Sequence, residues 1–121
     1  MSVMSKAQRA VQLWSVLILA ARNQQVLSYS ILEKLTGLPK FSFGDFLGPV
    51  TCYCRVHKLP PLTVLVVSEE TGLPGEKYPE HPNIFDGQAR VFVYDWLAHG
   101  VPSPEDFEAA IEQVRAPKAS A

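Results

Sequence analysis

The sequence has few cysteines, no long apolar run and almost no net charge, and these absences exclude several classes of protein. Cys52 and Cys54 lie two residues apart, a spacing that suits a disulfide in neither a helix nor a strand, so a disulfide framework is excluded. The apolar run 11–21 is interrupted by polar residues and is far shorter than the roughly 20 residues of a membrane span. It ends in Arg22 and polar residues rather than in the small residues of a cleavage site, so we expect no signal peptide and a cytoplasmic protein without a membrane partner.

The motifs of common catalytic and metal sites are also missing. Cys52, Cys54 and His57 form C-x-C-x-x-H, but a structural zinc site needs four ligands, and the other two histidines, His81 and His99, are remote in sequence. The glycine-containing stretch 71–76 lacks the lysine and the hydroxyl residue of a phosphate-binding loop, and no histidine has the partner spacing of a hydrolase. We therefore expect no metal site, no cofactor and no enzyme activity.

Charge is distributed unevenly along the chain. Residues 1–58 carry seven basic and two acidic side chains, a net of +5, whereas residues 59–121 carry four basic and ten acidic ones, a net of −6. Such asymmetry indicates a face for a polyanion in the first half. An acidic half that only keeps the protein soluble is the alternative.

Apolar periodicity and capping residues predict a chain of mostly helical elements. A buried helix is expected over 6–25, because apolar residues recur there every three or four positions. Ser28 is expected to cap a second helix that Gly37 ends, and a third helix over 42–58 would be kinked or split by Pro49. The β-branched run 62–68 predicts a strand that continues, through a glycine-containing loop, into a return strand near Lys77.

The C-terminal part is expected to form helices over about 87–115. Asp86 would cap the first of them, although residues 88–97 also have high strand propensity and the choice between helix and strand stays open there. Ser103 would cap the last helix, with Asp106 at its third position. Together these elements predict one α+β domain over 1–121, a winged helix-turn-helix over about 28–58 with a β-hairpin wing at about 62–79.

The order of motifs resembles the winged-helix DNA-binding domain of the O6-alkylguanine alkyltransferases and their non-catalytic alkyltransferase-like relatives. The residues that match the family pattern extend over about 26–78: Val26, Ser28, Tyr29, Ile31, Gly37, Pro39, Pro60, Pro61, Val66, Val67, Gly72 and Gly75. The Pro-Cys-His-Arg active-site segment is replaced by residues 62–65, Leu-Thr-Val-Leu, which excludes alkyl transfer by a thiolate at that position. Residues 40–43, Lys-Phe-Ser-Phe, stand where the recognition helix of the family carries its base-displacing arginine, so base flipping of that kind is in doubt.

Two functions are compatible with these observations. The first is non-catalytic binding of DNA or RNA, with phosphate contacts from residues of the basic half: Tyr29, Lys34, Lys40, Ser42, Arg55 and Lys58. Phe41 and Phe43 would be base-stacking platforms or, alternatively, core residues. The second is interaction with a protein partner or a second copy of the chain through the acidic, aromatic C-terminal half, with Tyr94 and Trp96 as anchors, as in an adaptor, an antitoxin-like or immunity protein, or a phage-encoded inhibitor.

Overall fold

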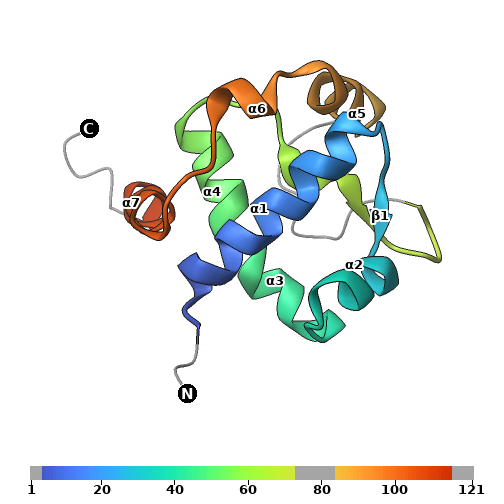
Figure 1. Cartoon of the computed structure of the whole chain (residues 1–121), viewed down its shortest axis with the longest axis horizontal. Helices are drawn as coiled ribbons and strands as arrows, with labels where there is room; N and C mark the ends of the chain where they lie inside the picture. The colour runs from blue at the N-terminus through green and yellow to red at the C-terminus, as the bar shows by residue number, and fades with distance from the viewer. Residues whose placement is uncertain (1–3, 73–83, 116–121) are drawn as a thin grey trace.

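The computed structural model describes residues 4–72 and 84–115 of the chain, and they form a mostly helical fold (Figure 1). Helices are joined by short connections, and two strands of two residues each complete the described part. In chain order the elements are α1 (Lys6–Arg22), β1 (Leu27–Ser28), α2 (Tyr29–Thr36), the 3-10 helix η1 (Lys40–Ser42), α3 (Phe43–Phe46), α4 (Gly48–Val56), the 3-10 helix η2 (Leu62–Leu65), β2 (Val66–Val67), α5 (Ile84–Val93), α6 (Trp96–His99) and α7 (Pro104–Arg115).

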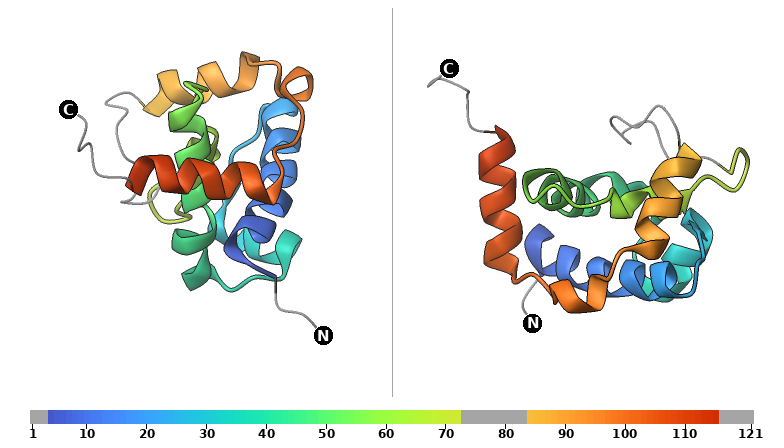
Figure 2. Two further views of the ribbon diagram at one scale, coloured as in Figure 1. Left: turned by 90° about the vertical axis from the view of Figure 1, so that its left-hand side faces the viewer. Right: turned by 90° about the horizontal axis from the view of Figure 1, so that it is seen from above.

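Helix α1 lies at the centre of the fold, in contact with α3, α4, α5, α7 and η2. A capping box of Ser5 and Gln8 starts the helix, and its inner residues, including Leu13, Trp14 and Leu17, are fully buried. Helix α7 packs across α4 and α1 at one side of the molecule, whereas α2, β1 and α5 lie at the other side (Figures 1 and 2). A single cluster of buried apolar side chains joins all of these helices.

The corner between α2 and the following helices confirms the capping pattern expected from the sequence. The Ser28 hydroxyl accepts a hydrogen bond from the Ile31 amide at 3.1 Å, and Gly37 ends α2 in the left-handed conformation with φ of 75°. The helix expected over 42–58, kinked or split by Pro49, is split into α3 and α4. Pro49 occupies the first turn of α4, where its missing amide hydrogen costs no helical hydrogen bond.

The winged α+β fold expected from the sequence is wrong in the part of the chain that the structure describes. Residues Leu62–Leu65 form a 3-10 helix, and β2 is only two residues long. It pairs with β1 in parallel, Leu27 with Val66 and Ser28 with Val67, whereas a hairpin wing requires antiparallel pairing. The return strand expected near Lys77 lies outside the described residues.

The 3-10 turn at η2 has a physical cause in the two prolines before it. Pro60 and Pro61 have no amide hydrogen to give to a strand ladder. The Pro61 carbonyl instead accepts a hydrogen bond from the Val64 amide at 3.0 Å, which closes the turn. The side chains of Val64, Leu65 and Val66 are nearly or completely buried. Consecutive residues of this segment are therefore apolar because all of them are buried, and not because the segment is a strand.

The region whose secondary structure was ambiguous is helical up to Val93. Helix α5 begins at Ile84, so Asp86 lies within its first turn and not at the expected cap position. The chain then breaks at Tyr94, and the Asp95 carboxylate caps α6 by accepting a hydrogen bond from the Ala98 amide at 3.2 Å. The helix expected after Ser103 is confirmed as α7.

Candidate functional site

The turn between α2 and α3 presents two side chains to solvent from a fixed backbone. Thr36 stabilises this turn, because its hydroxyl donates to the Leu32 carbonyl at 2.8 Å and accepts from the Leu38 amide at 3.2 Å. The hydroxyl of Ser42 donates to the Pro39 carbonyl at 2.6 Å. The hydroxyl of Ser42, predicted as a phosphate contact, is therefore engaged in a hydrogen bond within the turn. The chain leaves this turn through η1, which carries the exposed residues Lys40 and Phe41.

The aromatic pair Phe41 and Phe43 divides between surface and core. Phe43 is fully buried, and its ring lies 6.2 Å from the ring of Tyr29, centroid to centroid. Phe41 is 88% exposed. Residues two positions apart on a tightly wound helix point to different sides. The backbone that buries the ring of Phe43 therefore projects the ring of Phe41 into solvent. The sequence left open whether these two residues lie in the core or at the surface. Phe43 lies in the core, and Phe41 lies at the surface.

An open cleft of about 610 Å³ lies beside these residues. It is lined by residues from the start of α2, from the η1–α3 turn and from the segment after β2: Tyr29, Lys40, Phe41, Gly44, Ser68, Glu69 and Glu70. The cleft thus combines an exposed aromatic ring, a half-buried tyrosine, one cation and two carboxylates.

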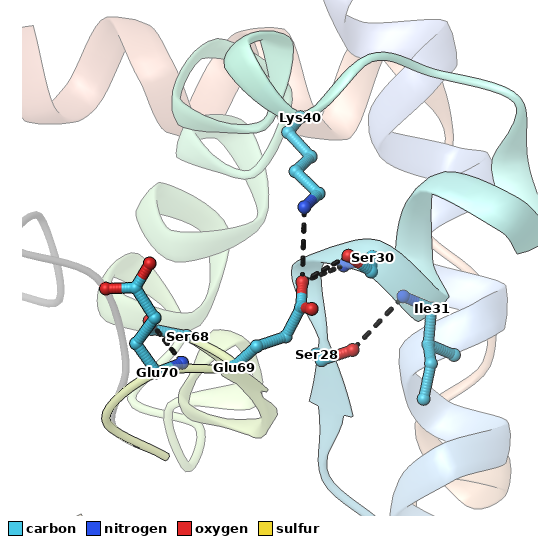
Figure 3. A network of polar contacts seen from close by, with 7 residues as sticks. All are labelled: Ser28, Ser30, Ile31, Lys40, Ser68, Glu69 and Glu70. Carbon is cyan, nitrogen blue, oxygen red and sulfur yellow. Dashed lines mark hydrogen bonds and ion pairs between the residues drawn. The ribbon is translucent and has the colours of Figure 1, made fainter.

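Glu69 connects the three segments that form the cleft (Figure 3). Its Oε1 atom accepts hydrogen bonds from the Ser30 amide at 3.2 Å and from the Ser30 hydroxyl, and it lies 3.2 Å from Nζ of Lys40. These hydrogen bonds, first that from the Ser30 hydroxyl and then that from Lys40, hold the pKa of Glu69 below its ordinary value. Sequence patterns did not indicate this contact, because Lys40 and Glu69 are 29 residues apart.

The other predicted nucleic-acid residues do not gather at this cleft. Lys34 is exposed in the last turn of α2, outside the cleft lining. Arg55 is exposed near the end of α4, and Lys58 is exposed just after it, with φ of 57°. Lys40 precedes α3 whereas Lys58 follows α4, so the whole helical segment 43–56 lies between them. Nine residues of α4 alone extend roughly 13 Å.

The inner face of α4 belongs to the core. Tyr53 is nearly buried, and its ring lies 5.3 Å from that of Trp14 and 5.4 Å from that of Phe107. Its hydroxyl is 2.7 Å from Nε2 of His99. Since α7 packs against α4, one side of the expected recognition helix is covered by protein.

The two predicted partner anchors also lie in different environments. Trp96 is fully buried; its indole nitrogen donates to the Val91 carbonyl at 2.8 Å, and its ring meets that of Trp14 edge to face at 5.5 Å. Tyr94 is half-buried and packs against Trp96 with 4.6 Å between ring centroids. Trp96 is therefore a core residue, and only Tyr94 reaches the surface.

Burial disfavours the thiolate form of both cysteines in this fold. Cys54 is buried in α4, and loss of solvent raises the pKa of its thiol to about 12. Burial also raises the pKa of the Cys52 thiol, although Arg55 opposes this shift. Across residues 4–72 and 84–115, no three histidine, cysteine or acidic side chains lie close enough together to hold a metal ion.

Within the described ranges, none of the helices combines the length and the apolar character that crossing a bilayer demands. Comparisons with protein-family models, with curated proteins and with solved structures found no match to this chain.

Proposed function

We propose that the chain is a non-catalytic nucleic-acid-binding protein whose contact surface is the cleft formed by Tyr29, Lys40 and Phe41. The observation that carries this proposal is Phe41, a phenyl ring 88% exposed next to Lys40 on the rim of a cleft. An aromatic ring left in water beside a cation is the combination that binds bases by stacking and the phosphate backbone by charge.

The surroundings of the cleft support the same function. Tyr29 offers a second aromatic ring in the lining of the cleft. The resemblance of residues 26–78 to the alkyltransferase family, which binds DNA, also favours it. Stacking on an exposed ring requires accessible base faces, so single-stranded nucleic acid is the preferred form.

The chemistry of the residues available supports binding without catalysis. Where the alkyltransferase family that the sequence resembles carries its nucleophilic cysteine, this chain has Thr63, whose hydroxyl oxygen lies 3.0 Å from that of Thr51. Thiolate chemistry elsewhere is disfavoured, because the Cys54 thiol stays protonated at neutral pH with a pKa of about 12. No alkyl transfer is expected from alkylated DNA.

Fluorescence anisotropy with labelled single-stranded and duplex oligonucleotides of about 12 units tests this function, starting near 50 mM salt where phosphate contacts are strong. Phe41→Ala should weaken single-strand binding roughly 5- to 150-fold, the equivalent of about 1–3 kcal/mol of stacking per base. Phe85→Ala is the matched control, because Phe85 is 75% exposed on α5 and does not line the cleft. Absence of binding by the wild-type chain at this salt would reject the proposal.

A second candidate function, binding of a protein partner or of a second copy through the C-terminal half, is favoured by one observation. Val93, Leu97 and Val101 are each more than half exposed within nine residues of chain. Light scattering over a concentration series tests the homodimer form of this function. If the chain dimerises, the double variant Val93→Ser with Leu97→Ser should remain monomeric, whereas a wild-type chain that is monomeric throughout would reject the homodimer.

A further inference from the structure

Three hydrogen-bond donors from two separate elements converge on one oxygen atom of Glu69. Two come from Ser30, the second residue of α2, and the third is the ammonium group of Lys40 on η1 (Figure 3). Among the described residues that line the cleft, Lys40 is the one cation, while Glu69 and Glu70 are anions. The cation of the proposed nucleic-acid surface is thus already paired with a carboxylate of the same chain.

The donors that Glu69 occupies are the ones that a phosphate oxygen would use. The Ser30 amide belongs to the first turn of α2, whose amides have no partner within the helix. Hydroxyl, amide and ammonium groups of this kind make most contacts to phosphate in nucleic-acid complexes. An ionised carboxylate resembles phosphate in charge and in its oxygen acceptors, so the two compete for the same groups.

We infer that Glu69 is an internal competitor of nucleic-acid phosphate: its carboxylate holds Lys40 and Ser30 in the free protein and must leave them when a phosphate binds at the cleft. Resting on the proposed function, this role makes Glu69 the residue that sets the affinity of the surface. The exchange requires little rearrangement, because the side chains of Lys40 and Glu69 are 51% and 48% exposed.

The variant Glu69→Gln tests this role, because glutamine keeps the size and a hydrogen-bond acceptor for Ser30 but removes the charge. We expect it to bind single-stranded oligonucleotide about fivefold more tightly than the wild type, a gain of the size of an exposed ion pair. The slope of log affinity against log salt should also steepen by about 0.7, since Lys40 becomes free to neutralise one phosphate. Thermal melting checks that the variant is folded.

Glu70→Gln is the matched control. It removes the same charge from the next residue of the same cleft, and Figure 3 shows the Glu70 side chain turned away from Lys40. A change of less than about twofold is expected, because only the overall charge differs. In a Lys40→Ala background, Glu69→Gln should lose most of its effect, since the cation it releases is absent.

The outcomes separate the inference from the function on which it rests. Equal gains from Glu69→Gln and Glu70→Gln would overturn the competition and leave nucleic-acid binding intact. If Glu69→Gln increases the affinity just as much in the Lys40→Ala background, the competition is overturned as well. If neither the wild type nor Glu69→Gln binds any oligonucleotide, the proposed function itself has failed. Binding by Glu69→Gln alone would support both.

Discussion

The hydroxyl oxygen of Tyr53 on α4 lies 2.7 Å from Nε2 of His99 on α6, although 46 residues separate them in sequence. This hydrogen bond joins the middle of the chain to its C-terminal part, beside a cluster of rings that includes Trp14 and Phe107. Because α4 contributes its inner face to this cluster and is covered on one side by α7, its exposed surface is restricted. At the start of the helical segment, by contrast, η1 leaves Lys40 and Phe41 exposed.

The first prediction concerns this hydrogen bond. Tyr53→Phe removes only the hydroxyl and should lower the free energy of unfolding by about 1 kcal/mol, the ordinary net value of one hydrogen bond. Tyr53→Ala removes the ring as well and should cost about 3–5 kcal/mol. Urea unfolding followed by circular dichroism measures both. Equal stability of Tyr53→Phe and the wild type would show that the bond contributes nothing.

The second prediction distinguishes core from interface at Trp96. Trp96→Ala should lower the free energy of unfolding by about 3–5 kcal/mol, because it leaves a cavity and deprives the Val91 carbonyl of its donor. The neighbouring variant Leu97→Ala should change it by less than about 0.5 kcal/mol, since Leu97 is exposed. A loss of partner binding in Trp96→Ala would thus reflect unfolding. A stable Trp96→Ala variant would contradict the packing.

The third prediction uses the capping box at the start of α7. The Asp106 carboxylate accepts from the Ser103 amide at 2.8 Å, and hydrogen bonds from Ser103, with a smaller effect of nearby His57, lower the pKa of Asp106. A depressed pKa in the folded state stabilises the fold above the unfolded pKa of about 3.9, and this contribution is lost as pH falls through the folded value.

Asp106→Asn should therefore reduce the dependence of the unfolding free energy on pH below about pH 4, where the wild type loses this contribution. Urea unfolding at pH steps from neutral to acid measures the slope. Glu108→Gln removes a charge from the same helix outside the capping box and serves as the control. Identical pH profiles for Asp106→Asn and the wild type would contradict the assignment.

The fourth prediction concerns the two thiols. Cys54 should react with a disulfide reagent near pH 8 only when the chain unfolds, because its thiol is buried and has a pKa of about 12. Cys52 should react slowly in the folded protein. The single variants Cys52→Ser and Cys54→Ser assign each rate, and urea should release Cys54. Fast labelling of the folded Cys52→Ser variant would show that Cys54 is accessible.

Local signals predicted the ends of helices well. Ser28, Gly37 and Ser103 act within three or four residues of themselves, so their roles follow from sequence alone. The segment 62–68 was predicted wrongly, because a short apolar run is compatible with a strand or with any other buried segment. Its conformation depends on Pro60 and Pro61 and on pairing with β1, whose sequence lies almost forty residues earlier.

The candidate site was predictable only in part. Lys40 and Tyr29 were predicted as phosphate contacts, and the structure places both in the lining of the cleft. Phe41 is at the surface and Phe43 in the core because of the way η1 packs against α2 and α3 against α1. Periodicity over two residues cannot show this. The contact between Lys40 and Glu69 depends on the tertiary fold, since it joins two turns that are remote in sequence.

The last prediction concerns the basic residues that the sequence grouped together. If Lys40, Arg55 and Lys58 all contacted phosphates of duplex DNA, replacing the three with Ala would flatten the slope of log affinity against log salt by roughly 2 to 3 units, about 0.9 for each contact. Because Lys40 lies at one end of the segment 43–56 and Lys58 beyond the other, the contributions should differ on a short single strand.

In the Glu69→Gln background, Lys40→Ala should flatten that slope by about 0.7. Arg55→Ala combined with Lys58→Ala should change it by less than half as much in the same background, because neither residue lines the cleft. Stability should hardly change in any of these variants, since exposed charges contribute little to folding. Arg22→Ala, which removes a cation from the end of α1 outside the cleft, is the control. If the Arg55 and Lys58 pair produces the larger change, nucleic acid binds at the C-terminal end of α4 and not at Phe41.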